Sequence, residues 1–386
     1  AMRHQNSVFH SVMKQVPWGA FDRLVGAHGT DYRVRRLTTK DQFVALLFGQ
    51  LAGASSLREI ELGLASHAAR LYHLGAHPAL RSTLAEANAK RTSAVFADLF
   101  SDMVGRAHRG LRRKMGEAVR LIDATMLPLN GLSAAWSRFS VKCCGAKAHV
   151  IYDPDADCPL YLAVTPAKGV DVVVAKDMPI EAKATYVFDL GYYDYGWWAK
   201  LDAAGCRIVT RFKRNTPFTA IREQRVPKAA QAILSDRIGH LPARLARSRR
   251  NPFAKPVREI RLRIDGGKIL RILTNDLDSP AQKIADLYKR RWAIELFFRW
   301  VKQTLKIRHF LGTSENAVRI QIAVALIAFL LLRLAQTAQN FADGALAFAR
   351  LVRLNLMHRR SINALKEPPP PIGRDPRQMD FAIDEI

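Results

Sequence analysis

Apolar residues recur along this chain with two different periods, and the change falls near residue 115. From Val8 to about Arg113 they return every three or four positions, which is the spacing of helices that bury one face. Beyond residue 117, short apolar runs alternate with helical segments, and two of these runs end in an acid, Asp123 and Asp189. The pattern predicts an all-α amino-terminal domain followed by an α/β core.

A third pattern begins at residue 212 and ends at residue 276. Three apolar residues, the last of them Ile264, alternate there with Arg261 and Arg263, so one face of the expected strand is apolar and the other is cationic. Asp265-Gly266-Gly267 then turns the chain, and residues 269–273 return as a second strand. We expect a β-rich insertion whose basic face presents Arg261 and Arg263.

The strongest apolar run extends from Ile322 to Leu332 and is closed by Arg333. It is too short to span a bilayer, so a buried core helix is the expected structure. A proline-rich segment at 367–371 indicates the end of the folded body. The expected domains are a helical accessory domain at 1–114, two parts of the core at 115–211 and 277–340, the insertion at 212–276, and a C-terminal helix and tail at 341–386.

Charge distinguishes this chain from an ordinary globular protein. Lys and Arg number 60 against 34 Asp and Glu, which gives a net charge of +26. So basic a surface repels itself unless its partner is a polyanion, and nucleic acid is the commonest one. Charge alone does not separate a nucleic-acid enzyme from a ribosomal-type basic protein. The four cysteines have no disulfide or zinc spacing, and no signal-peptide run opens the chain, so we expect a cytoplasmic, nucleoid-associated protein without membrane contact.

The most informative segment opens at Ser279, where Ser as N-cap and Pro280 at the first helical position predict a helix start. If the helix is continuous, four side chains point the same way within about 60°. These four are Tyr288, Arg291, Glu295 and Lys302, with Trp292 and Arg299 close by. The opposite side carries an apolar stripe for core packing, formed by Leu287, Ile294, Phe297, Phe298, Val301 and Leu305.

Three acids in this arrangement suit divalent metals. If Asp123 and Asp189 lie at strand ends facing Glu295, their oxygens can hold two Mg²⁺ ions, for which Mn²⁺ could substitute. Two such ions activate a water or a 3′-hydroxyl and stabilise the departing oxygen of a phosphodiester. Each acid alone also has an ordinary explanation as a turn cap or surface residue. Asp194 is a local rival to Asp189, which we prefer because it directly follows an apolar strand.

The spacing Y-x2-R-x3-E-x6-K in this helix resembles the YREK signature of the IS-four family of insertion-sequence transposases. The segments around Asp123 and Asp189 resemble the family's two aspartate segments, with Thr210-Arg211-Phe212-Lys213 behind the second. The likeness covers about residues 8 to 335 and includes an amino-terminal accessory domain. One departure is Leu190, where relatives usually carry Arg after the second Asp, so a possible phosphate contact is lost.

The resemblance implies an RNase H-like catalytic core with a β-rich insertion, and cut-and-paste transposition by a triad of Asp123, Asp189 and Glu295. The partners would be double-stranded DNA, both the terminal inverted repeats and the target. Two DNA ends must be cut and joined in concert, which predicts a homodimer in a synaptic complex.

The resemblance also implies which residues hold the DNA end. Excision would pass through a hairpin with a flipped base, stacked on Trp292 or on the Trp197-Trp198 pair. The expected DNA contacts are Tyr288, Arg291, Lys302, Trp292, Arg299, Arg261 and Arg263. Lys147 and His149 match a family segment and receive only a supporting role.

Two other classes of function remain open. The chain could be a former transposase that acts as a DNA-binding repressor, which the intact acids argue against, or a structure-selective nuclease without strand transfer. Asp153 to Asp157 imitates the opening of a calcium loop. Cys158 stands where such a loop needs Gly, so a β-turn is the expected structure.

Overall fold

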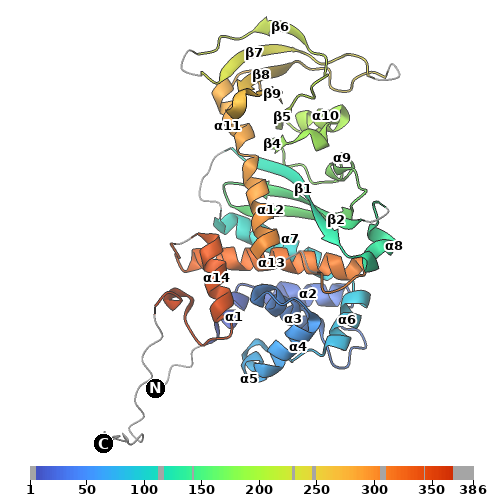
Figure 1. Ribbon diagram of the computed structural model, residues 1–386, viewed down its shortest axis with the longest axis vertical. Helices are drawn as coiled ribbons and strands as arrows, with labels where there is room; N and C mark the ends of the chain where they lie inside the picture. Colours follow the sequence, from blue (N-terminus) through green and yellow to red (C-terminus); the bar gives the residue numbers. More distant parts are fainter. Residues whose placement is uncertain are drawn as a thin grey trace, which may run out of the picture.

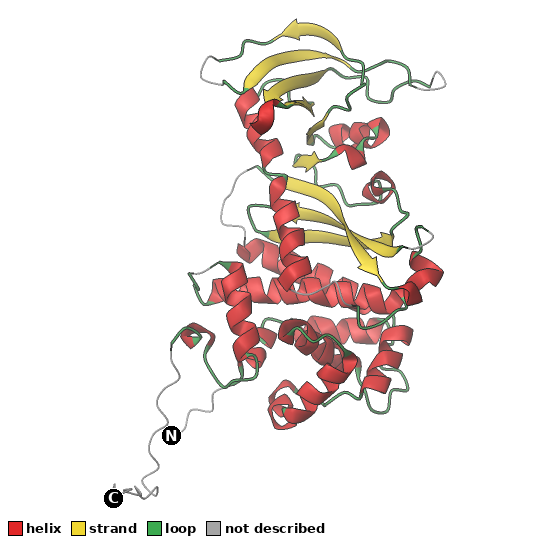
Figure 2. Cartoon of the chain, viewed as in Figure 1, coloured by secondary structure: helices red, strands yellow, loops and turns green. Residues whose placement is uncertain are grey.

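The computed structural model describes residues 6–111, 117–140, 143–227, 231–245, 249–304, 310–342 and 344–367. Its body is elongated, with helices gathered at one end and strands at the other (Figures 1 and 2). The result is a mixed α/β fold with amino-terminal helices and a large sheet. Leu305 and the proline-rich segment beyond residue 367 lie outside the described residues.

The amino-terminal region is helical, as its periodicity predicts. Its helices are α1 (Val8–Met13), α2 (Trp18–Ala27), α3 (Thr39–Ala52), α4 (Leu57–Ser66), α5 (Ala68–Leu71), α6 (Arg81–Lys90) and α7 (Ala94–Leu111). Helix α3 begins with a capping box, in which the side chains of Thr38 and Asp41 accept each other's backbone N–H. It ends at Gly53, whose left-handed φ of 76° favours glycine.

Helix α13 (Glu315–Ala338) contains the apolar run and is longer than that run. Its length and composition would be enough to cross a membrane, and it is the one such helix in the described part of the chain. It is instead a core helix, because it is largely buried and packs against α3, α6 and α7. Figure 1 shows it between the amino-terminal helices and the sheet, with α14 (Ala345–Asn355) beside it.

The sheet has nine strands in the order β3-β2-β1-β4-β5-β9-β8-β7-β6. Strands β1, β4 and β5 are parallel to one another, and every other neighbouring pair is antiparallel. The first five strands are β1 (Val119–Leu129), β2 (Cys144–Asp153), β3 (Cys158–Pro166), β4 (Thr185–Phe188) and β5 (Arg207–Arg211). The others are β6 (Thr219–Glu223), β7 (Ile233–His240), β8 (Val257–Arg263) and β9 (Ile269–Thr274).

The segment 212–276 supplies β6 to β9, and these strands continue the core sheet because β9 pairs with β5. The turn between β8 and β9 contains Gly266 at φ 79°, as the Asp-Gly-Gly sequence predicts. The expected alternation is wrong at one position. Ile264 was expected on the apolar face, but it is 44% exposed because β8 ends at Arg263.

Each face of the sheet has its own hydrophobic core, because successive strand side chains point to opposite faces. Leu121, Val187 and Val209 belong to the first core, which α11 (Ala281–Lys289) and α12 (Trp292–Thr304) help to cover. Ile122 and Phe188 belong to the second core. That core lies under α10 (Tyr195–Ala203) and α9 (Asp171–Ala175). The two faces therefore place alternate residues of β1, β4 and β5 in different surroundings.

Candidate active site

Asp123 lies in the middle of β1, on the face that α12 covers, and not at the strand end that the sequence predicts. It pairs in register with Val150 of β2, a residue of the first core. The ring of Tyr152, two residues further along that strand, packs against Phe297 of α12 at 4.9 Å. The side chain of Asp123 is only 18% exposed, and its Oδ1 accepts the backbone N–H of Ala124 at 2.8 Å. The first acid is therefore fixed against the sheet beneath a helix.

Asp189 directly follows β4 and lies, by alternation with Val187, on the same face as Asp123. It caps the 3-10 turn Leu190–Tyr192, since its Oδ1 accepts the N–H of Gly191 at 2.7 Å. The rival Asp194 has a structural role. It caps α10 through the N–H of Trp197 at 2.8 Å and pairs with Lys176 at 2.8 Å.

The segment around Glu295 departs from the single helix expected from the sequence. The chain forms two helices, α11 and α12, separated at Arg290 and Arg291. There the backbone N–H groups of Arg291 and Ala293 bond three residues back, to Tyr288 and Arg290, which interrupts the α-helical ladder. The apolar stripe is nevertheless buried at each described position, Leu287, Ile294, Phe297, Phe298 and Val301.

The expected helix start is also displaced by one residue. Pro280 occupies the N-cap position of α11, and its carbonyl accepts the N–H of Ile284 at 3.3 Å. Ser279 is not the cap, because its own N–H donates to Asp276 Oδ1 at 2.8 Å in the turn before the helix.

The three acids act on one another electrostatically. Burial, together with the negative charges of Asp189 and Glu295, raises the pKa of Asp123 to about 6. The N–H of Ala124 and the charge of Arg291 oppose that rise. The structure thus brings together the three acids that the sequence singled out, from β1, from the end of β4 and from α12.

Arg291 lies between two of these acids. Its Nη1 is 3.6 Å from Oδ2 of Asp123, and its Nη2 donates to Oε1 of Glu295. The guanidinium also lies 6.0 Å from the ring centroid of Tyr288, a buried residue of α11 whose pKa burial raises. Arg291 therefore supplies positive charge at the centre of the acidic cluster.

The other expected DNA contacts occupy different environments. Trp292 is 52% exposed and has Arg299 at 6.0 Å from its ring, so both are accessible beside Glu295. Lys302 lies in the last turn of α12. A stacking role for the Trp197-Trp198 pair is wrong, because both indoles are buried in the second core, where Trp198 Nε1 donates to the carbonyl of Tyr192.

Two residues near the acids carried no explicit prediction. Arg211 ends β5 on the same face of the sheet as Val209. Its positive charge opposes the rise in the pKa of Tyr288, and its buried Nε has no hydrogen-bond partner in the described structure. The sequence feature that could have identified Arg211 is the Thr210–Lys213 segment, which resembles the family. Asp171, at the start of α9, lies near Asp189, because a Cβ built on Gly191 would be 3.4 Å from Asp171 Oδ2 and 3.0 Å from Asp189 Oδ1. No sequence pattern marked Asp171.

Lys147 and His149 lie beside Asp171 in supporting positions. Lys147 Nζ donates to Asp171 Oδ1 at 2.8 Å and to the carbonyl of Gly169 at 2.9 Å. His149 is fully buried, is hydrogen-bonded to Thr165 at 2.8 Å, and has its pKa lowered to about 4 by burial. It is therefore neutral at physiological pH, as a structural histidine is.

The donor set suits a hard cation, because carboxylate oxygens are the ligands that Mg²⁺ prefers. Within the described residues, no three His, Cys, Asp or Glu side chains are close enough to form a ready metal cluster. Asp123 and Glu295 instead share the guanidinium of Arg291. The carboxylate oxygens of the acids therefore suit a metal ion, but Asp123 and Glu295 are paired with Arg291 in this structure.

A basic cluster lies further along the sheet, on β7, β8 and β9. The fully buried Glu259 pairs with Arg237, Arg261 and Arg271, so one acid holds three cations. Hydrogen bonds from Arg237 and Arg271 keep the pKa of Glu259 below its usual range, although burial alone would raise it. Arg263 is exposed at the end of β8. This surface retains a net positive charge.

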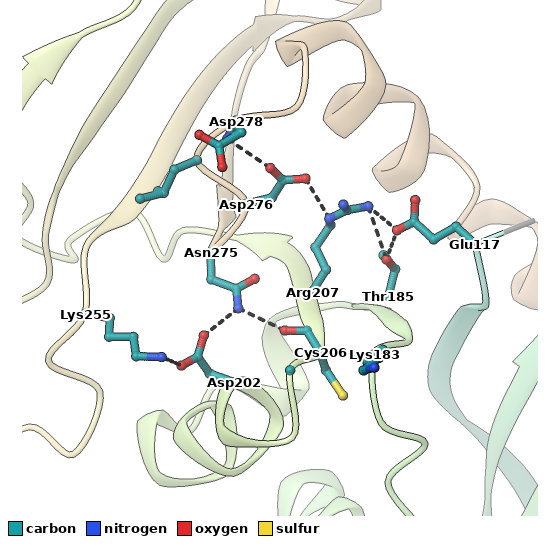
Figure 3. A pocket seen from close by; sticks show the side chains of 12 residues that line it. Glu117, Lys183, Thr185, Asp202, Cys206, Arg207, Lys255, Asn275, Asp276 and Asp278 are labelled. Atoms are coloured by element: carbon teal, nitrogen blue, oxygen red, sulfur yellow. Dashed lines mark hydrogen bonds and ion pairs between the residues drawn. The ribbon is translucent and has the colours of Figure 1, made fainter.

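A cavity of about 700 Å³ lies at the opposite end of the parallel strands and does not belong to the acidic site. It borders Thr185 and Arg207, which begin β4 and β5, whereas Asp189 follows β4. Figure 3 shows its acids in ion pairs: Arg207 Nε with Asp276 at 2.6 Å, and Lys255 with Asp202 at 2.6 Å. These ion pairs join the segment after β9 to β5, and the segment before β8 to α10.

Three acids on one face of a mixed sheet, in a chain of net charge +26, fit an enzyme that acts on nucleic acid. Residues 114–331 match the family described as the Transposase DDE domain. Residues 4–77 match a family described only as a domain of unknown function.

Individual relatives agree with the family match. A protein named as transposase y4zB, from Sinorhizobium fredii (strain NBRC 101917 / NGR234), is 42% identical over 305 residues, covering 78% of this chain and 85% of the relative. One named as the transposase for insertion sequence element IS5377, from Geobacillus stearothermophilus, is 28% identical over 259 residues, covering 66% of this chain and 67% of the relative. The cryo-EM structure of a piggyBac transposase synaptic complex with hairpin DNA has a TM-score of 0.45 and 12% identity, over 96% of this chain and 84% of that one.

The chain belongs to the family of transposases with a DDE domain. It is a transposase of the insertion-sequence type, an enzyme of DNA cleavage and strand transfer.

Proposed function

We propose that this chain is the transposase of a bacterial insertion sequence of the IS-four type, and that Asp123, Asp189 and Glu295 are its catalytic acids. The observation that supports this most is the position of the three acids on one face of the sheet, where the charges of Asp189 and Glu295 raise the pKa of Asp123 and Arg291 contacts both Asp123 and Glu295. Tyr288, Arg291, Glu295 and Lys302 have the YREK spacing, although a break between α11 and α12 divides them.

The sheet supports an RNase H-like core. The order β3-β2-β1-β4-β5, with β2 antiparallel to parallel strands β1, β4 and β5, is the arrangement expected of that fold. Its acids come from the first strand, from the end of the fourth and from a helix that covers the same face. Strands β6 to β9 fall between the second and third acids, where the insertion was expected.

Asp123, Asp189 and Glu295 would hold two Mg²⁺ ions, or Mn²⁺ in their place. Bound there, the metals would activate the attacking oxygen and stabilise the departing one. Arg291 and the unpaired Nε of Arg211 would bind phosphates of the DNA end, and Lys302 would add charge beside them. Trp292, exposed beside Glu295 with Arg299 over its ring, would stack on a flipped base at a hairpin end.

The basic surface of the outer strands would bind the duplex beyond the cut. Glu259 fixes Arg237 and Arg271 through buried ion pairs, while Arg261 and Arg263 reach the surface of β8. Arginines fixed in this way lose little conformational entropy when they bind phosphate. The DNA partners would be the terminal inverted repeats and the target, held by a homodimer in the cytoplasm on the nucleoid.

The test uses purified protein, Mg²⁺ and labelled duplex that carries the inverted repeat flanking the gene. The wild type should cleave and join strands, and Glu295→Gln should bind the duplex without cleaving it. Glu315→Gln is the matched control, because Glu315 also pairs with an arginine four residues away on a helix, outside the site. Binding without cleavage by the wild type would favour a repressor, cleavage without joining a nuclease, and cleavage by Glu295→Gln another active site.

A further inference from the structure

Arg291 occupies an unusual position, at the break between two helices and between two acids. Its backbone belongs to the tightened turn from Tyr288 to Ile294, held by hydrogen bonds of 3.1 and 3.2 Å. Its side chain is 18% exposed and contacts Asp123 and Glu295 together. The backbone of Arg291 is therefore held by hydrogen bonds, while its guanidinium stays partly accessible to solvent.

The cluster of acids needs a counter-charge when it holds no metal. Like charges at short range oppose one another's ionisation, and burial of Asp123 adds to that cost. A guanidinium meets this need well, since its planar donors can serve two carboxylates at once. The geometry shows such a shared arrangement, with 3.6 Å to Asp123 and a direct hydrogen bond to Glu295.

The same contacts prevent the acids from forming a metal site. Oε1 of Glu295 accepts from Arg291 and is directed toward that side chain, and a cation near Asp123 repels a second cation at the same place. This agrees with the absence of a ready three-ligand cluster among the described residues. Metal binding at Asp123 and Glu295 therefore requires Arg291 to leave.

We propose that Arg291 is an internal counter-ion that closes the metal site of the DNA-free protein, and that a phosphate of the DNA end draws it away and opens the site. The inference rests on the proposed function of the three acids. A phosphate competes effectively for a guanidinium because it offers the same paired oxygen geometry as a carboxylate. DNA and metal then strengthen each other's binding, and the protein without DNA holds little activating metal.

The experiment measures Mn²⁺ binding directly, from the electron paramagnetic resonance signal of the free ion, in protein without DNA. Arg291→Gln should bind Mn²⁺ about tenfold more tightly than the wild type, within the usual range of coupling between sites. Arg290→Gln is the matched control, since it removes a neighbouring cation that pairs with Asp155 at 2.7 Å, outside the cluster. It should leave Mn²⁺ affinity within about twofold of wild type, because the charge of Arg290 is paired with Asp155 and its partly exposed side chain is screened by solvent and salt.

A second measurement adds inverted-repeat duplex, with Mn²⁺ bound by DNA alone subtracted. The duplex should tighten Mn²⁺ binding to the wild type and change that of Arg291→Gln little. Arg291→Lys, which keeps the charge but lacks the planar fork, should lie between the two. The wild-type measurement with and without duplex remains decisive if Arg291→Gln fails to fold.

The inference is overturned if Arg291→Gln binds Mn²⁺ no better than the wild type, or if duplex leaves the wild-type affinity unchanged. In either case, loss of Mn²⁺ binding in Glu295→Gln would leave the proposed metal site standing. If Asp123→Asn and Glu295→Gln bind Mn²⁺ as the wild type does, the metal lies elsewhere, and the proposed function fails together with the inference.

Discussion

Gly191 donates its backbone N–H to the carboxylate of Asp189 at 2.7 Å, and little room remains beside that carboxylate for a side chain at residue 191. A Cβ on Gly191 would lie 3.0 Å from Asp189 Oδ1 and 3.4 Å from Asp171 Oδ2. The second acid of the proposed triad is therefore held by a close approach, which a side chain at residue 191 would widen by a few tenths of an ångström.

Gly191→Ala should displace the Asp189 carboxylate and lower the rate of DNA cleavage by about tenfold or more, since small displacements of catalytic groups are costly. The variant should still fold, because Gly191 is exposed. Gly131→Ala is the matched control, as Gly131 also lies in a 3-10 turn but has open space around its Cα. Equal cleavage rates for the two variants would contradict a positioning role for Gly191.

Asp123 should make stability depend on pH in the direction opposite to an ordinary paired acid. Its pKa is raised to about 6, so the folded protein holds this proton more tightly than the unfolded chain. The loss of folding stability caused by ionising Asp123 is absent below pH 4, grows as the pH rises toward 6, and is complete above pH 6. In EDTA at pH 7.5, Asp123→Asn should raise the free energy of unfolding by about 2 kcal/mol, and by much less at pH 4.

Asp194 provides the comparison of opposite sign. Burial opposes its ionisation, but hydrogen bonds from Lys176 and from the N–H of Trp197 outweigh burial and lower its pKa. Asp194→Asn should therefore lower stability at pH 7.5. Denaturant unfolding of both variants at the two pH values checks the prediction, and a stabilising effect of Asp123→Asn that is equal at both pH values would contradict it.

The arginines of β8 should contribute to DNA affinity through phosphates. Replacing both Arg261 and Arg263 with Ala should reduce the slope of log affinity against log salt by about 2, which corresponds to two lost phosphate contacts. Fluorescence anisotropy of labelled duplex at several salt concentrations measures this slope. Arg319→Ala, which removes a cation paired with Glu315 on α13, should leave it unchanged. An unaltered slope in the double variant would exclude these side chains from the DNA interface.

Arg207 should matter for stability and little for chemistry. It joins Glu117, before β1, to Asp276, after β9 (Figure 3). This pairing lies at the end of the parallel strands opposite to Asp189. Arg207→Gln should lower the free energy of unfolding by about 2 kcal/mol, since it leaves the largely buried Asp276 without its ion-pair partner and removes one of the two cations paired with Glu117. Cleavage per folded molecule should stay near the wild-type value at low temperature. A selective loss of cleavage in a stably folded variant would instead assign the cavity a role in catalysis.

The sequence marks both aspartates by the apolar runs before them and Glu295 by the apolar stripe opposite it. The expected strand end at Asp123 is wrong, because β1 continues to Leu129 through its pairing with β2. The break at Arg291 was not predictable in this way. Apolar residues continue at helical spacing through it, from Leu287 to Ile294, and neither Gly nor Pro marks it. Only the backbone bonds to residues three positions back reveal that Tyr288 and Glu295 belong to different helices.

Contacts between distant segments account for the other differences. Trp197 and Trp198 follow polar and glycine residues, so nothing local shows that they lie in a core shared with Phe188. The proximity of Asp171 to Asp189 arises from packing of α9 against the turn after β4. The role of Glu259 among three arginines likewise depends on the register of β7, β8 and β9. Patterns along one segment carry no information about such pairings.

The central claim is that the acids at 123, 189 and 295 together bind the metal. Fe²⁺ substituted for Mg²⁺, with ascorbate and peroxide, cleaves the polypeptide wherever the bound ion lies close to the backbone. In the presence of inverted-repeat duplex, we expect fragments that end near Asp123, Asp189 and Glu295, and their common loss in Asp123→Asn. Fragments that map elsewhere, or that persist in Asp123→Asn, would contradict the account.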